Sequence, residues 1–119
     1  MAWKPDRQRP ICPQICEHLC VCIARGELMP NERVPSVRET AAQISVNPNT
    51  VQHAFTELEQ QGVLYSIQGM GWFVNENTET ARAVLERLAH QKTAAFFADM
   101  ENLGLDAERV KTYVKEWCV

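Results

Sequence analysis

The sequence predicts a mainly α-helical fold that is α+β only to a minor extent, because its β component is one short hairpin. Apolar residues recur at helical spacing in five stretches of the chain, whereas only residues 63–74 have the composition of short paired strands. The length of 119 residues, 45% of them hydrophobic, allows one compact domain or one domain with a helical appendage.

The first helix is expected over residues 13–25, because Ile15, Leu19 and Ile23 share one helical face and Gly26 is a good C-terminal stop. The ten residues at the start of the chain are polar and include two prolines, so we expect a flexible arm there. A loop is expected between this helix and the next one.

Two further helices have strong start signals. Ser36 can cap a helix, and Glu39 stands three residues further on, which is the spacing of a capping box. Asn47 is a favoured N-cap, and Pro48 is favoured at the first helical position.

These two helices, near residues 36–45 and 48–61, are separated by a two-residue turn, which is the spacing of a helix-turn-helix. The outer N-terminal face of the second helix is polar and almost uncharged, a pattern that suits the edges of DNA bases as well as water. It carries Pro48, Asn49, Gln52, His53 and Thr56.

Residues 63–66 and 72–74 form two short β-type runs, and Gly69 and Gly71 bracket Met70 in the turn between them. A hairpin directly after a helix-turn-helix is typical of the wing of a winged helix. The rest of the chain is predicted to be helical.

Thr78 is expected to cap a long helix that ends near residue 103, and Asp106 to cap a last helix. We therefore predict two parts. A winged helix-turn-helix domain covers residues 8–76, and a two-helix appendage covers residues 77–119.

Several short motifs follow one another in residues 33–74. They are Arg33-Val34-Pro35-Ser36-Val37-Arg38-Glu39, Ala41-Ala42, Val46-Asn47-Pro48-Asn49-Thr50-Val51, Glu57-Leu58-Glu59-Gln60-Gln61-Gly62 and Gly69-Met70-Gly71-Trp72-Phe73-Val74. In this order and at this spacing they resemble the GntR family of bacterial regulators, most of all its YtrA-type subfamily. The resemblance covers roughly residues 8–76, with a looser fit over the first helix, and it implies that the appendage is a dimerisation module.

The resemblance implies a sequence-specific transcription regulator that binds double-stranded DNA, with repression as the usual mode in the family. By resemblance to the family, Arg38 is expected to contact a phosphate, the second helix of the motif to be the recognition helix, and the wing tip to reach the minor groove. The residues implied to contact DNA are Ser36, Arg38, Asn47, Asn49, Thr50, Gln52, His53, Gln68 and Gly69.

Three positions depart from the family pattern. Residues 66–70 lack the basic residues that many relatives carry at the wing, Gln52 stands where arginine is common, and Ser45 replaces a commoner glycine. Fewer positive charges predict weaker DNA affinity or a greater reliance on the dimer.

Apolar residues on the two C-terminal helices are expected to form a homodimer contact. They are Leu85, Leu88, Phe96, Met100, Tyr113 and Trp117. Such a symmetric dimer would place two recognition helices about 34 Å apart, so the operator is expected to be an inverted repeat. A pocket for a small-molecule effector of unknown identity is the alternative use of Phe96, Phe97, Tyr113 and Trp117.

The charge of the chain counts against DNA binding. The net charge is −3, and residues 1–75 hold six Lys or Arg and seven Asp or Glu, so the predicted DNA-binding part is not basic. A winged-helix module for protein interaction, with weak or lost DNA binding, therefore stays open as an alternative.

Five cysteines raise a third possibility. Cys12, Cys16 and Cys20 lie on one helical stripe with Cys22 nearby, a cluster that either packs a helix interface or serves a thiol- or metal-responsive regulator. We favour packing, because the spacing lacks the Cys-x2-Cys pair of structural zinc sites. Cys22 and Cys118 are expected to be exposed.

No catalytic cluster, phosphate-binding glycine loop or convincing metal set is present in the sequence. We therefore expect no enzyme, no cofactor and no metal. No apolar run approaches the roughly 20 residues that span a bilayer, and no signal segment follows the first residues, so a cytoplasmic protein is expected.

Overall fold

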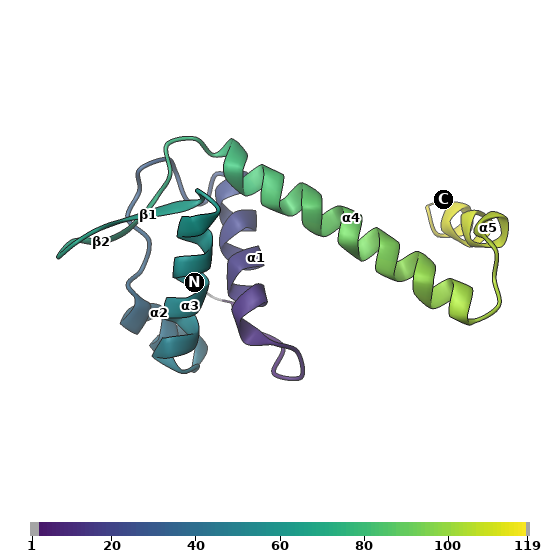
Figure 1. The fold of residues 1–119 in the computed structure, drawn as a ribbon, viewed down its shortest axis with the longest axis horizontal. Helices are drawn as coiled ribbons and strands as arrows, with labels where there is room; N and C mark the ends of the chain where they lie inside the picture. The colour runs from purple at the N-terminus through teal and green to yellow at the C-terminus, as the bar shows by residue number, and fades with distance from the viewer. Residues whose placement is uncertain (1–2, 119) are drawn as a thin grey trace. The chain divides into compact units, whose positions relative to one another are not determined.

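The computed structural model of the chain describes residues 3–118. It divides into two compact units, Met1–Leu85 and Glu86–Val119. The first unit holds the helices α1 (Ile11–Ala24), α2 (Val37–Ile44) and α3 (Pro48–Gln60), and the strands β1 (Leu64–Ile67) and β2 (Gly71–Val74) (Figure 1). Helix α4 (Glu79–Asn102) begins in the first unit and continues into the second, which also holds α5 (Ala107–Trp117). The mainly helical class with one hairpin is confirmed.

The core of the first unit forms where α3 packs against α1 and α2. Ile15 and Leu19 of α1, Ile44 of α2, and Phe55 and Leu58 of α3 are at most 1% exposed. Burial of such side chains is the dominant stabilising contribution to a small domain. The apolar periodicity of the sequence thus corresponds to the faces that the three helices turn inward.

Local hydrogen bonds set the start of α2 and α3, as predicted. The Glu39 backbone N–H donates to Ser36 Oγ at 3.0 Å, and the Ser36 N–H donates to Glu39 Oε1 at 3.2 Å, which completes a capping box. At α3 the Asn49 N–H donates to Asn47 Oδ1 at 2.8 Å, and Pro48 follows the cap directly.

The turn between α2 and α3 depends on Ser45, which has a left-handed backbone conformation with φ of 55°. This conformation at the end of a helix normally favours glycine. Here the Val46 N–H donates to the Ala41 carbonyl at 3.0 Å and closes the turn. The chain is thereby redirected into α3.

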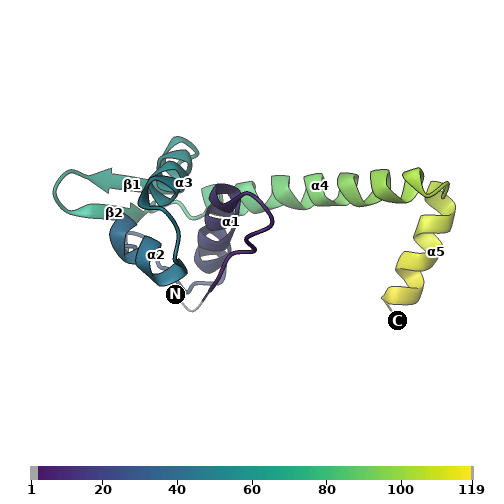
Figure 2. The same cartoon turned by 90° about the horizontal axis from the view of Figure 1, so that it is seen from below.

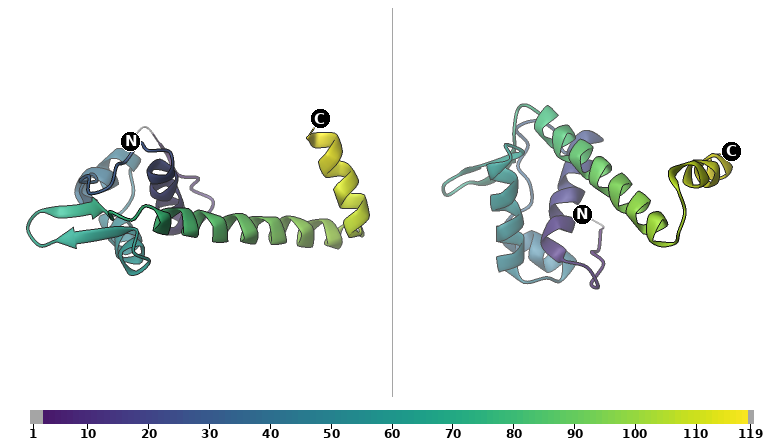
Figure 3. Two further views of the ribbon diagram at one scale, coloured as in Figure 1. Left: turned by 90° about the horizontal axis from the view of Figure 1, so that it is seen from above. Right: turned by 45° about the vertical axis from the view of Figure 1, so that its right-hand side comes forward.

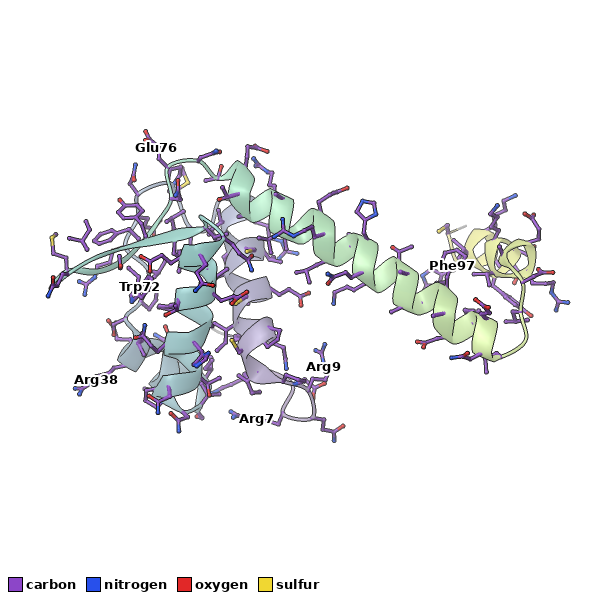
Figure 4. All side chains as sticks on the ribbon, viewed as in Figure 1. Arg7, Arg9, Arg38, Trp72, Glu76 and Phe97 are labelled. Atoms are coloured by element: carbon purple, nitrogen blue, oxygen red, sulfur yellow. The ribbon has the colours of Figure 1, made fainter. Side chains whose placement is uncertain are left out.

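The expectation of a flexible N-terminal arm is wrong for residues 3–10. The buried Gln14 side chain accepts a hydrogen bond from the Asp6 N–H and donates to the Asp6 carbonyl, both at 2.8 Å. Arg7 donates to the Ile44 carbonyl at 2.6 Å and to the Ser45 carbonyl at 2.8 Å (Figure 4). A guanidinium at this place satisfies carbonyls that the end of α2 leaves unpaired.

The wing is an antiparallel hairpin in which Leu64 pairs with Val74 and Ile67 pairs with Gly71 (Figure 2). Residues 68–70 form its turn, closed by a hydrogen bond of 2.9 Å from the Met70 N–H to the Ile67 carbonyl. Figure 3 shows the hairpin extending beyond the helices of its own unit.

The two C-terminal helices start at side-chain caps, but one cap differs from the expected residue. Asn77 rather than Thr78 caps α4, since its Oδ1 accepts a hydrogen bond from the Glu79 N–H at 3.1 Å. The predicted cap of α5 is confirmed, because the Arg109 N–H donates to Asp106 Oδ1 at 2.9 Å. Among the described helices, none combines the length and hydropathy needed to cross a membrane.

Replacing Ser45 by glycine is expected to stabilise the protein. Glycine removes the steric cost of φ near 55°, and this gain exceeds its larger entropy loss, so the free energy of unfolding should rise by about 0.5–1 kcal/mol. Urea unfolding followed by circular dichroism measures the change. Ala42→Gly, at an exposed position inside the same helix, is the matched control and should lower stability by about 1 kcal/mol. Destabilisation by both glycines would contradict this account of Ser45.

Candidate nucleic-acid interface

Helix α3 has one fully buried side and one side that faces solvent. Its buried side consists of Val51, Ala54, Phe55 and Leu58, each 0% exposed. The opposite side is polar and consists of Asn49, Gln52, His53, Thr56, Glu57, Glu59 and Gln60. The sequence-predicted recognition helix therefore has its polar face outward, where a ligand can reach it.

The exposed face of α3 divides into two halves with different chemistry. Its N-terminal half offers amide and imidazole groups from Asn49, Gln52 and His53, all exposed and without formal charge when the histidine is neutral. A shallow depression begins at Gln52 and His53 and continues to Glu57. The carboxylates of Glu57 and Glu59 in the C-terminal half repel phosphate, so the N-terminal half is the better surface for a nucleic acid.

Two of the predicted contact residues are already engaged as helix caps. The Ser36 oxygen accepts the Glu39 N–H, and hydrogen bonds from the Ser36 backbone N–H and from the Ser36 hydroxyl both contribute to the lowered pKa of the Glu39 carboxyl. The Asn47 Oδ1 accepts the Asn49 N–H, which leaves the Asn47 amide nitrogen free to donate elsewhere. The Asn47 cap can therefore add a donor to the surface without giving up its structural role, whereas Ser36 would have to exchange its hydrogen bond to Glu39.

Arg38 and Thr50 complete the predicted contacts around α2 and α3. Arg38 is exposed and extends away from α2 (Figure 4). Thr50 is half-buried in the first turn of α3. An exposed cation in the first turn of α2 suits a phosphate of the DNA backbone.

The wing tip carries Gln68 and Gly69, both exposed, and it is apolar on either side of them. Met70 is 58% exposed and Ile67 is 40% exposed. Gly69 has φ of 80°, which the tight turn requires. None of residues 63–74 is a lysine or an arginine.

Sequence reasoning missed two arginines that tertiary contacts bring to this region. Arg7 reaches the carbonyls at the end of α2, and Arg33 lies with its guanidinium against Gly71 of the wing. Arg33 is part of a recognisable motif, but the periodicity of the sequence gives no sign that its side chain meets the hairpin. Both contacts join segments that are far apart in the chain.

The second unit gathers part of the predicted dimerisation set. An apolar groove between α4 and α5 is lined by Phe96, Met100, Tyr113, Val114 and Trp117. Trp117 is 90% exposed, an unusual environment for so large an apolar side chain. Leu85 and Leu88 lie earlier in α4, are half-buried and do not line this groove. Phe97 lies in the same part of α4 (Figure 4) and lines a neighbouring depression with three lysines.

Comparisons with a family model and with individual proteins all point to the same family. Residues 13–74 match the family model described as bacterial regulatory proteins, gntR family. The chain is 35% identical over 107 residues to YhcF, an uncharacterized HTH-type transcriptional regulator of Bacillus subtilis, covering 90% of this chain and 88% of the relative. It is 30% identical over 113 residues to the HTH-type transcriptional repressor YtrA of Bacillus subtilis, covering 94% and 87%.

Solved structures agree with this result. A GntR family transcriptional regulator from Listeria monocytogenes superposes with a TM-score of 0.78 at 31% identity, covering 94% of this chain and 98% of that one. The structure of AraR(DBD) in complex with operator ORE1 gives a TM-score of 0.54 at 35% identity, covering 56% and 80%. The winged helix-turn-helix predicted from the sequence is confirmed as the fold.

The cysteine cluster packs the inner face of α1. Cys16 and Cys20 are buried, and Cys16 Sγ lies 3.5 Å from the Ala54 carbonyl of α3. The expectation that Cys22 is exposed is wrong, because it is 5% exposed and its Sγ lies 3.5 Å from His18 Nε2. The exposure of Cys118 is confirmed. Within residues 3–118, no group of three or more His, Cys, Asp or Glu side chains is placed to hold a metal ion.

Burial also makes these thiols poor nucleophiles. It raises the pKa of Cys16 from the ordinary 9.0 to about 12 and that of Cys22 to about 11, and it raises the pKa of Cys12 as well. The thiolate is the reactive form, so thiols with raised pKa values react slowly with oxidants and ligate metals poorly. The geometry therefore favours packing over sensing.

A thiol count on the native protein is expected to separate the two uses of the cysteines. At about pH 8 a disulfide reagent should label exposed Cys118 quickly, half-buried Cys12 slowly, and Cys16, Cys20 and Cys22 only after unfolding. The Cys118→Ser variant should lose the fast phase alone. Fast labelling of Cys16 or Cys22 in the folded protein would contradict the packing role.

Proposed function

Because this chain belongs to the gntR family of bacterial regulatory proteins, we propose that it binds operator DNA as a homodimer and represses transcription. Its family and relatives are transcription regulators, so the protein is a DNA-binding regulator and not an enzyme. The observation that carries the proposal is the exposed N-terminal half of α3, because a major groove admits an α-helix and the polar, nearly uncharged side chains of this half can hydrogen-bond to base edges.

The proposed contacts fall into three kinds. Side chains at the start of α3 read base edges in the major groove, while α2 supplies contacts to phosphate and the wing tip enters the adjacent minor groove. The base-edge set is Asn47, Asn49, Thr50, Gln52 and His53. The phosphate set is Ser36 and Arg38, and the wing-tip pair is Gln68 and Gly69.

The proposed dimer forms through residues 77–119, while residues 8–76 bind DNA. Exposed Trp117 and the groove around Phe96 and Met100 offer an apolar surface that a second copy can cover. The exposure of Trp117 favours this use over an enclosed effector pocket. A two-fold dimer requires an inverted-repeat operator, and operator binding places the protein in the cytoplasm.

The rival role as a protein-interaction module has one observation in its favour. The net charge is −3, and the exposed face of α3 includes the carboxylates of Glu57 and Glu59. DNA binding and protein binding differ in their response to salt, because phosphate neutralisation releases counterions. Salt dependence therefore distinguishes them.

Binding to duplex DNA is expected to be measurable by fluorescence anisotropy at low salt and to weaken steeply as salt rises. Arg38→Gln should weaken binding to random and selected duplexes alike and lower the salt slope by about 0.9. Gln52→Ala should cost about 1–3 kcal/mol on an operator selected from genomic fragments and much less on random duplex.

Arg82→Gln is the matched control for charge, because exposed Arg82 lies on α4 and is paired with Glu79 at 2.6 Å. It should bind like the unmodified protein. An absence of binding to any duplex at low salt would exclude the DNA role and leave the protein-interaction role. A selected operator without an inverted repeat would exclude the two-fold dimer on DNA.

The Trp117→Glu substitution is expected to weaken the dimer at least 100-fold, which corresponds to about 2.7 kcal/mol, because the exposed indole would be a central contact. Sedimentation equilibrium gives the dissociation constant. Thr112→Glu places the same charge on α5 at an exposed position outside the groove and should leave the dimer intact. Equal dimerisation of the two variants would refute this interface.

A further inference from the structure

The wing of this protein has no cation of its own, since residues 63–74 include neither lysine nor arginine. Phosphate neutralisation is the largest sequence-independent contribution to DNA binding, so an uncharged wing would add little to affinity. The structure nevertheless brings one guanidinium to this hairpin from a different part of the chain.

The segment before α2 runs along the free edge of β2. Arg33 forms an antiparallel bridge with Phe73, and the Val34 N–H donates to the Trp72 carbonyl at 2.9 Å. The Val74 N–H donates to the Glu32 carbonyl at 2.9 Å on the other side of this bridge. These backbone contacts hold the Cα of Arg33 at a fixed place beside the hairpin.

The Arg33 side chain then continues toward the wing tip. A methyl group at position 71 would lie only 3.1 Å from Arg33 Nε and 3.5 Å from its Nη2, so the guanidinium occupies the space left by the missing side chain of Gly71. Gly71 pairs with Ile67 in the last register pair before the turn. The charge is therefore located next to the tip that carries Gln68 and Gly69.

The guanidinium at this position remains available to a ligand. Arg33 is exposed, and within residues 3–118 its guanidinium makes no hydrogen bond or salt bridge, although it interacts electrostatically with the Glu39 carboxylate, whose pKa it helps to lower. Its acidic neighbour Glu39 is committed to the capping box, where the Ser36 backbone N–H is the main cause of the lowered pKa of that carboxyl. An exposed planar fork of N–H donors suits a phosphate, which it can bind through two hydrogen bonds.

We propose that Arg33 is the phosphate-binding residue of the wing and contacts the DNA backbone beside the minor groove that the wing tip enters. The inference rests on the DNA binding proposed above. It assigns the charge of the wing to the loop before α2, and it gives Gly71 the role of leaving room for that charge.

The test measures how the binding of the unmodified protein and of its variants to a fluorescently labelled duplex of random sequence depends on salt. Arg33→Gln should lower affinity about tenfold or less at low salt and reduce the slope of log K against log salt by about 0.9, one phosphate contact. Arg33→Lys keeps the charge and should keep most of the slope. Arg82→Gln removes an equal charge elsewhere in the same unit and should leave the slope unchanged.

Each outcome decides the inference. A folded Arg33→Gln protein, checked by thermal unfolding, whose slope equals that of Arg82→Gln overturns it. If Arg33→Gln does not fold, Arg33→Met takes its place, because it keeps a long side chain without the charge. A folded Arg33→Met protein should lose about 0.9 of slope, and an unchanged slope overturns the inference. Failure of the unmodified protein to bind duplex overturns the proposed function itself. Normal binding by the unmodified protein, with an unchanged salt slope in the Arg33→Gln variant, overturns only the inference about Arg33.

Discussion

Helix α3 buries one of its faces completely, and this burial determines which of its side chains face solvent. Phe55 and Leu58 are 0% exposed between α1 and α2, and a rotation of α3 about its axis would bring both into water. Exposure of a buried leucine or phenylalanine side chain costs about 1.5–3 kcal/mol, so the loss of both would remove a large part of the stability of a small domain. The core therefore fixes which side chains face outward, and Asn49, Gln52 and His53 need no interactions of their own to hold that direction.

The direction in which α3 leaves α2 depends on a second set of contacts, from segments outside the helix-turn-helix. Ser45 takes a left-handed conformation, and Arg7 donates to the carbonyls of Ile44 and Ser45. Buried Gln14 holds the backbone of Asp6, which keeps Arg7 within reach. The N-terminal arm thus acts as an additional support for the turn. Serine is less favourable than glycine in this left-handed conformation, and the positive charge of Arg7 helps to stabilise the end of α2 where it stands.

Features that depend on neighbours in sequence could be predicted, whereas those that depend on distant segments could not. Apolar periodicity and the caps at Ser36 and Asn47 involve residues within one helical turn of each other, so the sequence was sufficient for the helices and for the polar face of α3. The packed arm, the burial of Cys22 and the position of the Arg33 guanidinium arise where separate segments meet. The assignment of individual side chains to DNA contacts remains a prediction, because it depends on a partner molecule.

A net charge of −3 is compatible with binding to a polyanion because the charges that matter are local. At physiological ionic strength charge interactions are screened over about 8 Å, so a phosphate at the wing or at α2 responds to the nearest side chains and hardly to acidic residues farther away. Arg38 and Arg33 are exposed at these two places, and Glu57 lies toward the C-terminal end of α3. Glu59 is the exception, because its carboxylate accepts a hydrogen bond from Ser66 Oγ of β1 at 2.8 Å and so lies beside the base of the wing. With Arg38 and Arg33 as the cations proposed to meet phosphate, electrostatic attraction alone would give little affinity, so in the proposed complex base-edge hydrogen bonds and the pairing of two subunits would supply most of it. Such a regulator would discriminate strongly between operator and random DNA, since the contribution common to all sequences is small.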